Sequence, residues 1–95
     1  MENREIYIIC TRDSRGRYVR AATSNRAKAH ADAERCAGEY VELYAYTLTE
    51  RQQIRQEPGT PTPPDVPAVV EVLHLTNEKG EFLNVEIYRV QEPGQ

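Results

Sequence analysis

Two histidines and two cysteines are the side chains of this sequence best suited to metal binding or nucleophilic chemistry. His30 is expected on a helix and His74 on a strand, and neither has partner residues at metal-ligand spacing. Cys10 and Cys36 stand among apolar or small residues, so we expect buried free thiols at core-facing positions. The sequence has no Gly-rich phosphate loop and no nucleophile elbow. It therefore predicts a protein with no metal, no cofactor and no enzymatic activity.

A cluster of arginines around one turn is the first candidate for a binding site. It consists of Arg12, Arg15, Arg17 and Arg20, with Tyr18 among them. Arginines with an interleaved aromatic residue suit phosphate contact and base stacking. They equally suit docking on an acidic protein patch through forked, charge-assisted hydrogen bonds. The alternative is a solvated turn kept soluble by its charges, which Asp13 partly neutralises.

The second candidate is a set of tyrosines in the segment Glu39–Leu48. Its alternation predicts a strand with Val41, Leu43 and Ala45 on one face and Tyr40, Tyr44 and Tyr46 on the other. We expect these tyrosines on a sheet face that no helix covers, where the register would decide whether Tyr7 and Tyr88 join them. Tyrosine is enriched at interfaces, so the face is either a partner-binding or dimerisation surface or an ordinary half-exposed sheet face. Pairing of two copies across it predicts a homodimer.

Two β-hairpins begin and end the chain. β-branched and aromatic residues predict their strands, and Asp13–Gly16 and Asn77–Gly80 supply the turns. The four strands are expected at Glu5–Thr11 and Arg17–Thr23 for the first hairpin, and at Val69–Leu75 and Phe82–Val90 for the second.

Between the hairpins, Arg26–Ala37 is rich in strong helix formers, with Gly38 at the position of a C-cap. Its inner face consists of Ala29, Ala33, Cys36 and Ala37, which lets a helix lie close to a sheet. After the strand Glu39–Leu48, a capping box from Thr49 predicts a short helical turn over Glu50–Gln56. Glu57–Pro67 is Pro-rich and predicts an extended surface connector.

The expected element order is β-β-α-β-linker-β-β. It predicts an α+β fold, in which an antiparallel sheet of about five strands carries one main helix on one face. A chain of 95 residues and 10.9 kDa forms one domain over residues 1–95, with a frayed tail at Gln91–Gln95.

Charge and hydropathy restrict the partners. The net charge is −3, which argues against nonspecific duplex binding by the whole molecule. Residues 1–56 carry a balance of +2 and residues 57–95 one of −5, so we expect two differently charged faces. The acidic face would meet a basic partner or simply keep the protein soluble, and it includes Glu71, Glu78, Glu81, Glu86 and Glu92. No apolar run approaches a membrane span and the start is no signal peptide, which predicts a cytoplasmic protein.

Three functions remain: a protein-binding inhibitor or adaptor, a nucleic-acid-binding module using the arginine hairpin and exposed tyrosines, and, least favoured, a small enzyme. In layout the chain resembles the small proteins that bacteriophages and mobile elements encode against host defence, anti-CRISPR proteins among them. A β-hairpin, the Ala-rich helix Arg26–Ala37 and the strand Glu39–Leu48 in an acidic chain of this size carry the resemblance. It implies a stoichiometric inhibitor of a larger host protein or ribonucleoprotein and assigns no residue a role.

Overall fold

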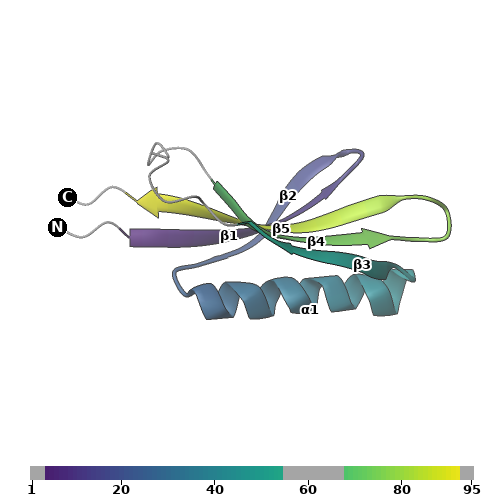
Figure 1. Ribbon diagram of the computed structural model, residues 1–95, viewed down its shortest axis with the longest axis horizontal. Coiled ribbons are helices and arrows are strands. Elements are labelled where there is room, and N and C mark those ends of the chain that lie inside the picture. The colour runs from purple at the N-terminus through teal and green to yellow at the C-terminus, as the bar shows by residue number, and fades with distance from the viewer. Residues whose placement is uncertain (1–3, 55–67, 93–95) are drawn as a thin grey trace.

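The computed structural model describes residues 4–54 and 68–92. It is an α+β fold with a five-stranded antiparallel sheet in the order β2-β1-β5-β4-β3 and one helix packed against it (Figure 1). The elements are β1 (Arg4–Asp13), β2 (Gly16–Thr23), α1 (Arg26–Tyr44), β3 (Thr47–Gln53), β4 (Ala68–Thr76) and β5 (Phe82–Glu92). The predicted fold class is confirmed. The predicted connector Glu57–Pro67 lies outside the described residues.

Both predicted hairpins are confirmed. In the first turn, the Asp13 carboxylate accepts hydrogen bonds from the backbone N–H groups of Arg15 and Gly16, and Gly16 takes a positive φ of 146°. In the second turn, the Asn77 side chain accepts from the backbone of Lys79 and Glu81. β5 continues to Glu92, two residues beyond the predicted strand, so the first two residues of the expected frayed tail are paired with β1, and the rest of that tail lies outside the described residues.

The helix begins as its sequence indicates. The Asn25 side chain caps it by accepting from the backbone N–H of Lys28 at 3.0 Å. The predicted alanine stripe faces the sheet, with Ala29, Ala33 and Ala37 at most 2% exposed. Because methyl groups are the largest side chains on this stripe, the helix backbone lies close to the strands.

The predicted end of the helix is wrong. α1 continues through Gly38 to Tyr44, and Ala45 ends it in the left-handed conformation with φ of 57°. The segment Glu39–Leu48 is therefore mostly helical instead of a strand. The third strand is instead β3. It extends to Gln53 and so includes the beginning of the segment Glu50–Gln56, where a helical turn was expected.

The hydrophobic core lies between α1 and one face of the sheet. Its largest fully buried apolar side chains are Ile9, Val85, Ile87 and Leu75, from β1, β5 and β4. Two polar pairs also tie the helix to the sheet. His30 lies 2.8 Å from the Glu71 carboxylate on β4, and Arg51 on β3 donates two hydrogen bonds to Glu34.

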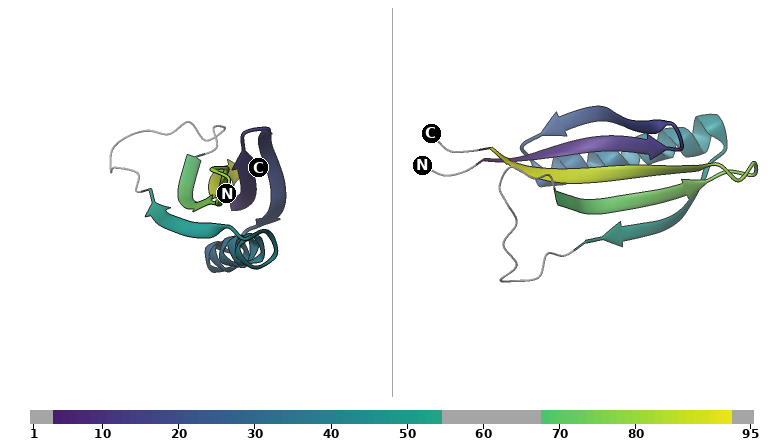
Figure 2. Two further views of the ribbon diagram at one scale, coloured as in Figure 1. Left: turned by 90° about the vertical axis from the view of Figure 1, so that its right-hand side faces the viewer. Right: turned by 90° about the horizontal axis from the view of Figure 1, so that it is seen from above.

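Within residues 4–54 and 68–92, no helix covers the opposite face of the sheet (Figure 2). On this face the β1–β2 hairpin rises away from α1 and from β4 and β5 (Figure 1). The β1–β2 register shifts between Ile9 and Cys10, so Arg20 is the extra residue of a bulge in β2. A bulge increases the local twist of a strand pair, which accounts for the raised hairpin. No helix in the described part of the chain is long and apolar enough to cross a membrane.

Candidate functional site

The predicted tyrosine surface is wrong in its place on the fold. Tyr40 and Tyr44 belong to the last turns of α1, and Tyr46 lies between α1 and β3, so none of the three lies on the uncovered sheet face. Tyr40 instead packs against the other two, and its ring centroid lies 5.4 Å from the Tyr44 centroid and 5.8 Å from the Tyr46 centroid. Tyr40 and Tyr46 are half-buried against the core. Burial, with Glu81 and Asp13 nearby, raises the pKa of the Tyr46 hydroxyl.

Three large side chains at the end of α1 are open to solvent. Leu43 is 71% exposed, Tyr44 62% and Val41 40%. Tyr44 lies two helical turns after the buried Ala37, on the same face of α1. It therefore extends the alanine stripe beyond the end of the hydrophobic core. We call Val41, Leu43 and Tyr44, together with Tyr40, which contacts Tyr44, and Tyr46, which contacts Tyr40, the helix-end patch.

Arg20 connects the first hairpin to this patch. Its Nη2 donates to the Tyr40 hydroxyl at 2.9 Å, and its Nε donates to the Thr11 hydroxyl at 3.0 Å. Tyr18, from the same hairpin, is 48% exposed. Arg15 is exposed at the turn, in the lining of a shallow hollow shared with Tyr46 and Phe82. The arginine cluster is thus divided between two faces of the molecule.

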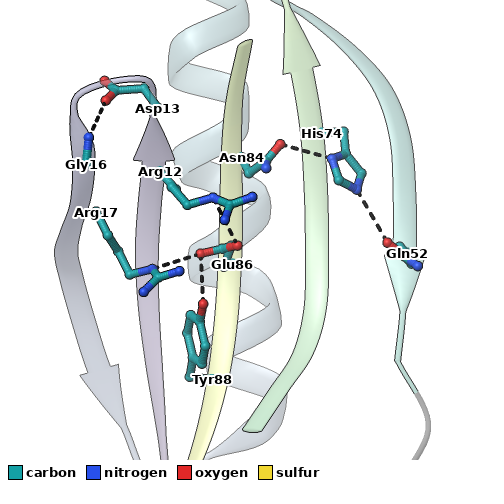
Figure 3. A network of polar contacts seen from close by, with 9 residues as sticks. All are labelled: Arg12, Asp13, Gly16, Arg17, Gln52, His74, Asn84, Glu86 and Tyr88. Atoms are coloured by element: carbon teal, nitrogen blue, oxygen red, sulfur yellow. Dashed lines mark hydrogen bonds and ion pairs between the residues drawn. The ribbon is translucent and has the colours of Figure 1, made fainter. Parts of the chain in front are cut away.

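The uncovered sheet face carries a row of polar side chains that crosses all five strands (Figure 3). The row consists of Arg17 on β2, Arg12 on β1, Asn84, Glu86 and Tyr88 on β5, His74 on β4 and Gln52 on β3. We call it the polar row.

Glu86 is at the centre of the polar row and is nearly buried, with 6% of its side chain exposed. Arg17 Nε donates to Oε1 at 3.2 Å, Arg12 Nε lies 3.6 Å from Oε2, and the Tyr88 hydroxyl donates to Oε1 at 3.1 Å. The Arg17 guanidinium also stacks over the Tyr88 ring at 5.2 Å. Burial and the Glu86 charge raise the pKa of Tyr88, while Tyr88 and Glu86 raise the pKa of Arg17.

His74 continues the row toward β3. Its Nδ1 lies 2.9 Å from Asn84 Oδ1, and its Nε2 lies 3.4 Å from Gln52 Oε1. Both ring nitrogens therefore face amide groups, and the imidazole is held between two neighbouring strands.

The two cysteines differ from their prediction in two respects, the face on which Cys10 lies and the partial exposure of Cys36. Both are free thiols, as expected, but Cys10 is buried on the uncovered face, where it pairs with Glu86 across the strands. Cys36 is half-buried on α1. Burial raises the pKa of both thiols, so they remain protonated near neutral pH and are poor nucleophiles.

The predicted acidic face also needs correction. Glu71 and Glu86 are 7% and 5% exposed, so they are not part of a solvated acidic surface. Glu71 is paired with His30, and Glu86 with the two arginines. Glu78 and Glu81 are exposed, as expected.

The Glu86 carboxylate contacts two guanidinium groups and a hydroxyl. In the described ranges 4–54 and 68–92, no group of three His, Cys, Asp or Glu side chains is placed to hold a metal ion. What the molecule presents is exposed apolar surface at the helix end and oriented arginines on the sheet.

Sequence reasoning missed the polar row as a connected set. It singled out Arg12 and Arg17 and placed Glu86 on a solvated acidic face, but assigned no binding role to Asn84 or His74. The signal was present in Phe82–Glu92, where Leu83, Val85 and Ile87 alternate with Asn84, Glu86 and Tyr88. That alternation places the polar residues opposite the core, but it does not reveal that the two arginines meet Glu86.

Comparison with known proteins yields no relative of this chain. No protein-family model, no curated protein and no solved structure matches it.

Proposed function

We propose that this protein acts without catalysis, by docking on a larger protein as a stoichiometric inhibitor or adaptor. The observation that carries the proposal is the exposure of Leu43 and Tyr44 at the end of α1, 71% and 62%. A small domain that leaves adjacent large apolar and aromatic side chains in water gains free energy when a partner covers them.

The support beneath these side chains favours the same function. Tyr44 rests on Tyr40, which is held from below by Tyr46 and at its hydroxyl by Arg20. An aromatic anchor that is already ordered loses little conformational entropy when it binds. The helix-end patch therefore has the properties of an interface hot spot.

Nucleic-acid binding is the alternative function. It would use the arginine hairpin, but the buried carboxylate of Glu86 lies between Arg12 and Arg17 and offsets part of their charge. The net charge of −3 further disfavours binding of the protein to the negatively charged backbone of a nucleic acid. A steep loss of oligonucleotide binding with rising salt would favour this alternative over protein docking.

The test compares capture by the wild-type chain with capture by a double variant, Leu43→Gln with Tyr44→Gln. Glutamine maintains helix propensity, so the variant should fold normally while losing its apolar surface. We expect a host protein retained at stoichiometric amounts by the wild type and lost by the variant. Ala31→Gln, at an exposed position of the same helix, is the control and should retain that protein.

A second copy of the chain is the other candidate occupant of the patch. The homodimer expected from the sequence would have used tyrosines on the uncovered sheet face, and that geometry is wrong. Sedimentation of the wild type and of the double variant separates the two occupants. A dimer that dissociates in the double variant would assign the patch to self-association and would contradict docking on a host protein.

A further inference from the structure

Arg12 and Arg17 are held side by side by one buried carboxylate. Each uses its Nε on a different oxygen of Glu86, at 3.6 and 3.2 Å, and Figure 3 shows both guanidinium groups converging on this carboxylate from neighbouring strands. Stacking on Tyr88 further restricts Arg17. The two side chains therefore have defined positions although they are 45% and 47% exposed.

The terminal nitrogens of both guanidinium groups remain available. Among residues 4–54 and 68–92, the only polar side-chain partner of either arginine at hydrogen-bond or ion-pair distance is Glu86, and it is reached through Nε. A guanidinium offers further N–H donors on its outer nitrogens, in a geometry that matches a carboxylate or phosphate. Two arginines and one glutamate leave a local charge of about +1, which suits one carboxylate better than a phosphate dianion.

Beyond the arginine pair and the polar row, the same sheet face becomes apolar. Along β1 the same face continues from Arg12 past Cys10 to the half-buried Ile8 and Ile6, and β5 places Val90 opposite Ile6. Val19 on β2, which pairs with Cys10, is 68% exposed. A nucleic acid offers little to cover such a surface, whereas a protein segment offers both carboxylates and apolar side chains.

We propose that the uncovered sheet face binds a protein segment that presents a glutamate or aspartate to Arg12 and Arg17 and apolar side chains to Ile6, Ile8 and Val90. This inference rests on the proposed function in taking the partner to be a protein, and it adds a second contact surface on the other side of the sheet from α1. Glu86 is a positioning residue here, because it orients the arginines and does not touch the partner.

The probe is a capped hexapeptide with one glutamate among leucines and serines, and its twin has glutamine in place of the glutamate. Binding is followed by NMR through the Nε–H signals of the arginines, at low salt. We expect the glutamate peptide to shift the Arg12 and Arg17 signals and to bind about fivefold or more tightly than its twin. Equal affinity of the two peptides, or no shift up to about millimolar peptide, would overturn the proposal.

The variant that tests the geometry is Arg12→Lys with Arg17→Lys. Lysine keeps both charges and the pairing with Glu86, so the fold should survive, but it lacks the forked donors. We expect the glutamate peptide to bind this variant about fivefold or more weakly, and Arg35→Lys, whose arginine pairs with Asp32 on α1, to behave as wild type. Unchanged affinity of the double variant would contradict the inference.

A single-stranded oligothymidine is the competing probe. If it shifts the same arginine signals at lower concentration than the glutamate peptide, the face is a nucleic-acid site and the inference is wrong. Failure with these probes does not affect the proposed function, because that is tested through Leu43 and Tyr44 at the helix end. Loss of docking there would likewise leave the peptide result unchanged.

Discussion

Arg20 donates a hydrogen bond to the Tyr40 hydroxyl at 2.9 Å and so joins β2 to the end of α1. The two residues were predicted in separate candidate surfaces, an arginine hairpin and a tyrosine sheet face. The same guanidinium holds Thr11 on β1, so three elements are fixed relative to one another at this point. The helix-end patch therefore includes a tyrosine, Tyr40, whose position is fixed by a hydrogen bond to the sheet.

The alanine stripe sets the distance between α1 and the sheet. Ala33 is 1% exposed, so Ala33→Leu inserts extra volume into a filled space and should destabilise the protein by about 1–3 kcal/mol. For a domain of this size that corresponds to a fall in Tm of several degrees. Ala31→Leu, at an exposed position of the same helix, should change stability by less than about 0.5 kcal/mol. Equal melting temperatures for the two variants would contradict the close packing.

Glu86 should contribute to stability although it is charged and lies on a face without a helix. Glu86→Ala removes the acceptor of the Tyr88 hydroxyl and of two guanidinium groups, and we expect a loss of about 1–3 kcal/mol in urea unfolding. Glu50→Ala, on the exposed edge strand β3, is the matched control and should be nearly neutral. A Glu86→Ala protein as stable as the Glu50→Ala protein would show that the polar row is not ordered in solution.

Glu34 should make the stability of the protein depend on pH in the acid range. Its hydrogen bond from Arg51 holds the pKa of this carboxyl below its ordinary value of 4.5. The Glu34 carboxylate of the unfolded chain therefore binds a proton more readily than that of the folded chain. The contribution of ionised Glu34 to stability is present above about pH 4.5 and is lost as the pH falls through the pKa of the folded state. Glu34→Gln should lower stability at pH 7 but have less effect near pH 2.5, which thermal melts at a series of pH values would measure. An effect independent of pH would contradict this assignment.

The sequence predicted the fold class because its two hairpins and the start of the helix have strong local signals. Asp13, Asn25 and Asn77 each make the turn or cap hydrogen bond expected of their residue type. Glu39–Leu48 was misassigned because its alternation fits a strand and Gly38 resembles a helix C-cap. In the structure Gly38 is inside the helix and exposed, where glycine costs only about 1 kcal/mol relative to alanine.

The error in this segment carried over to the candidate site. The end of α1 at Ala45 has no glycine to mark it, and β3 is a polar edge strand, Thr47–Gln53, without the apolar alternation of a half-buried strand. The tyrosines were therefore assigned to the sheet face instead of the helix end. The pairing of Arg12 and Arg17 with Glu86 depends on strand order, because β5 lies beside β1 only in the folded sheet. Local sequence patterns do not specify that order.

The central claim is that Leu43 and Tyr44 are the contact through which this protein docks on its partner. The most direct measurement is the Kd for the captured partner, by titration calorimetry, of the wild type and of Leu43→Gln, Tyr44→Gln and the control Ala31→Gln. Removal of either exposed anchor should raise the Kd by about tenfold or more, while the melting temperature and the affinity of Ala31→Gln remain as in the wild type. Wild-type affinity in both anchor variants would contradict the claim.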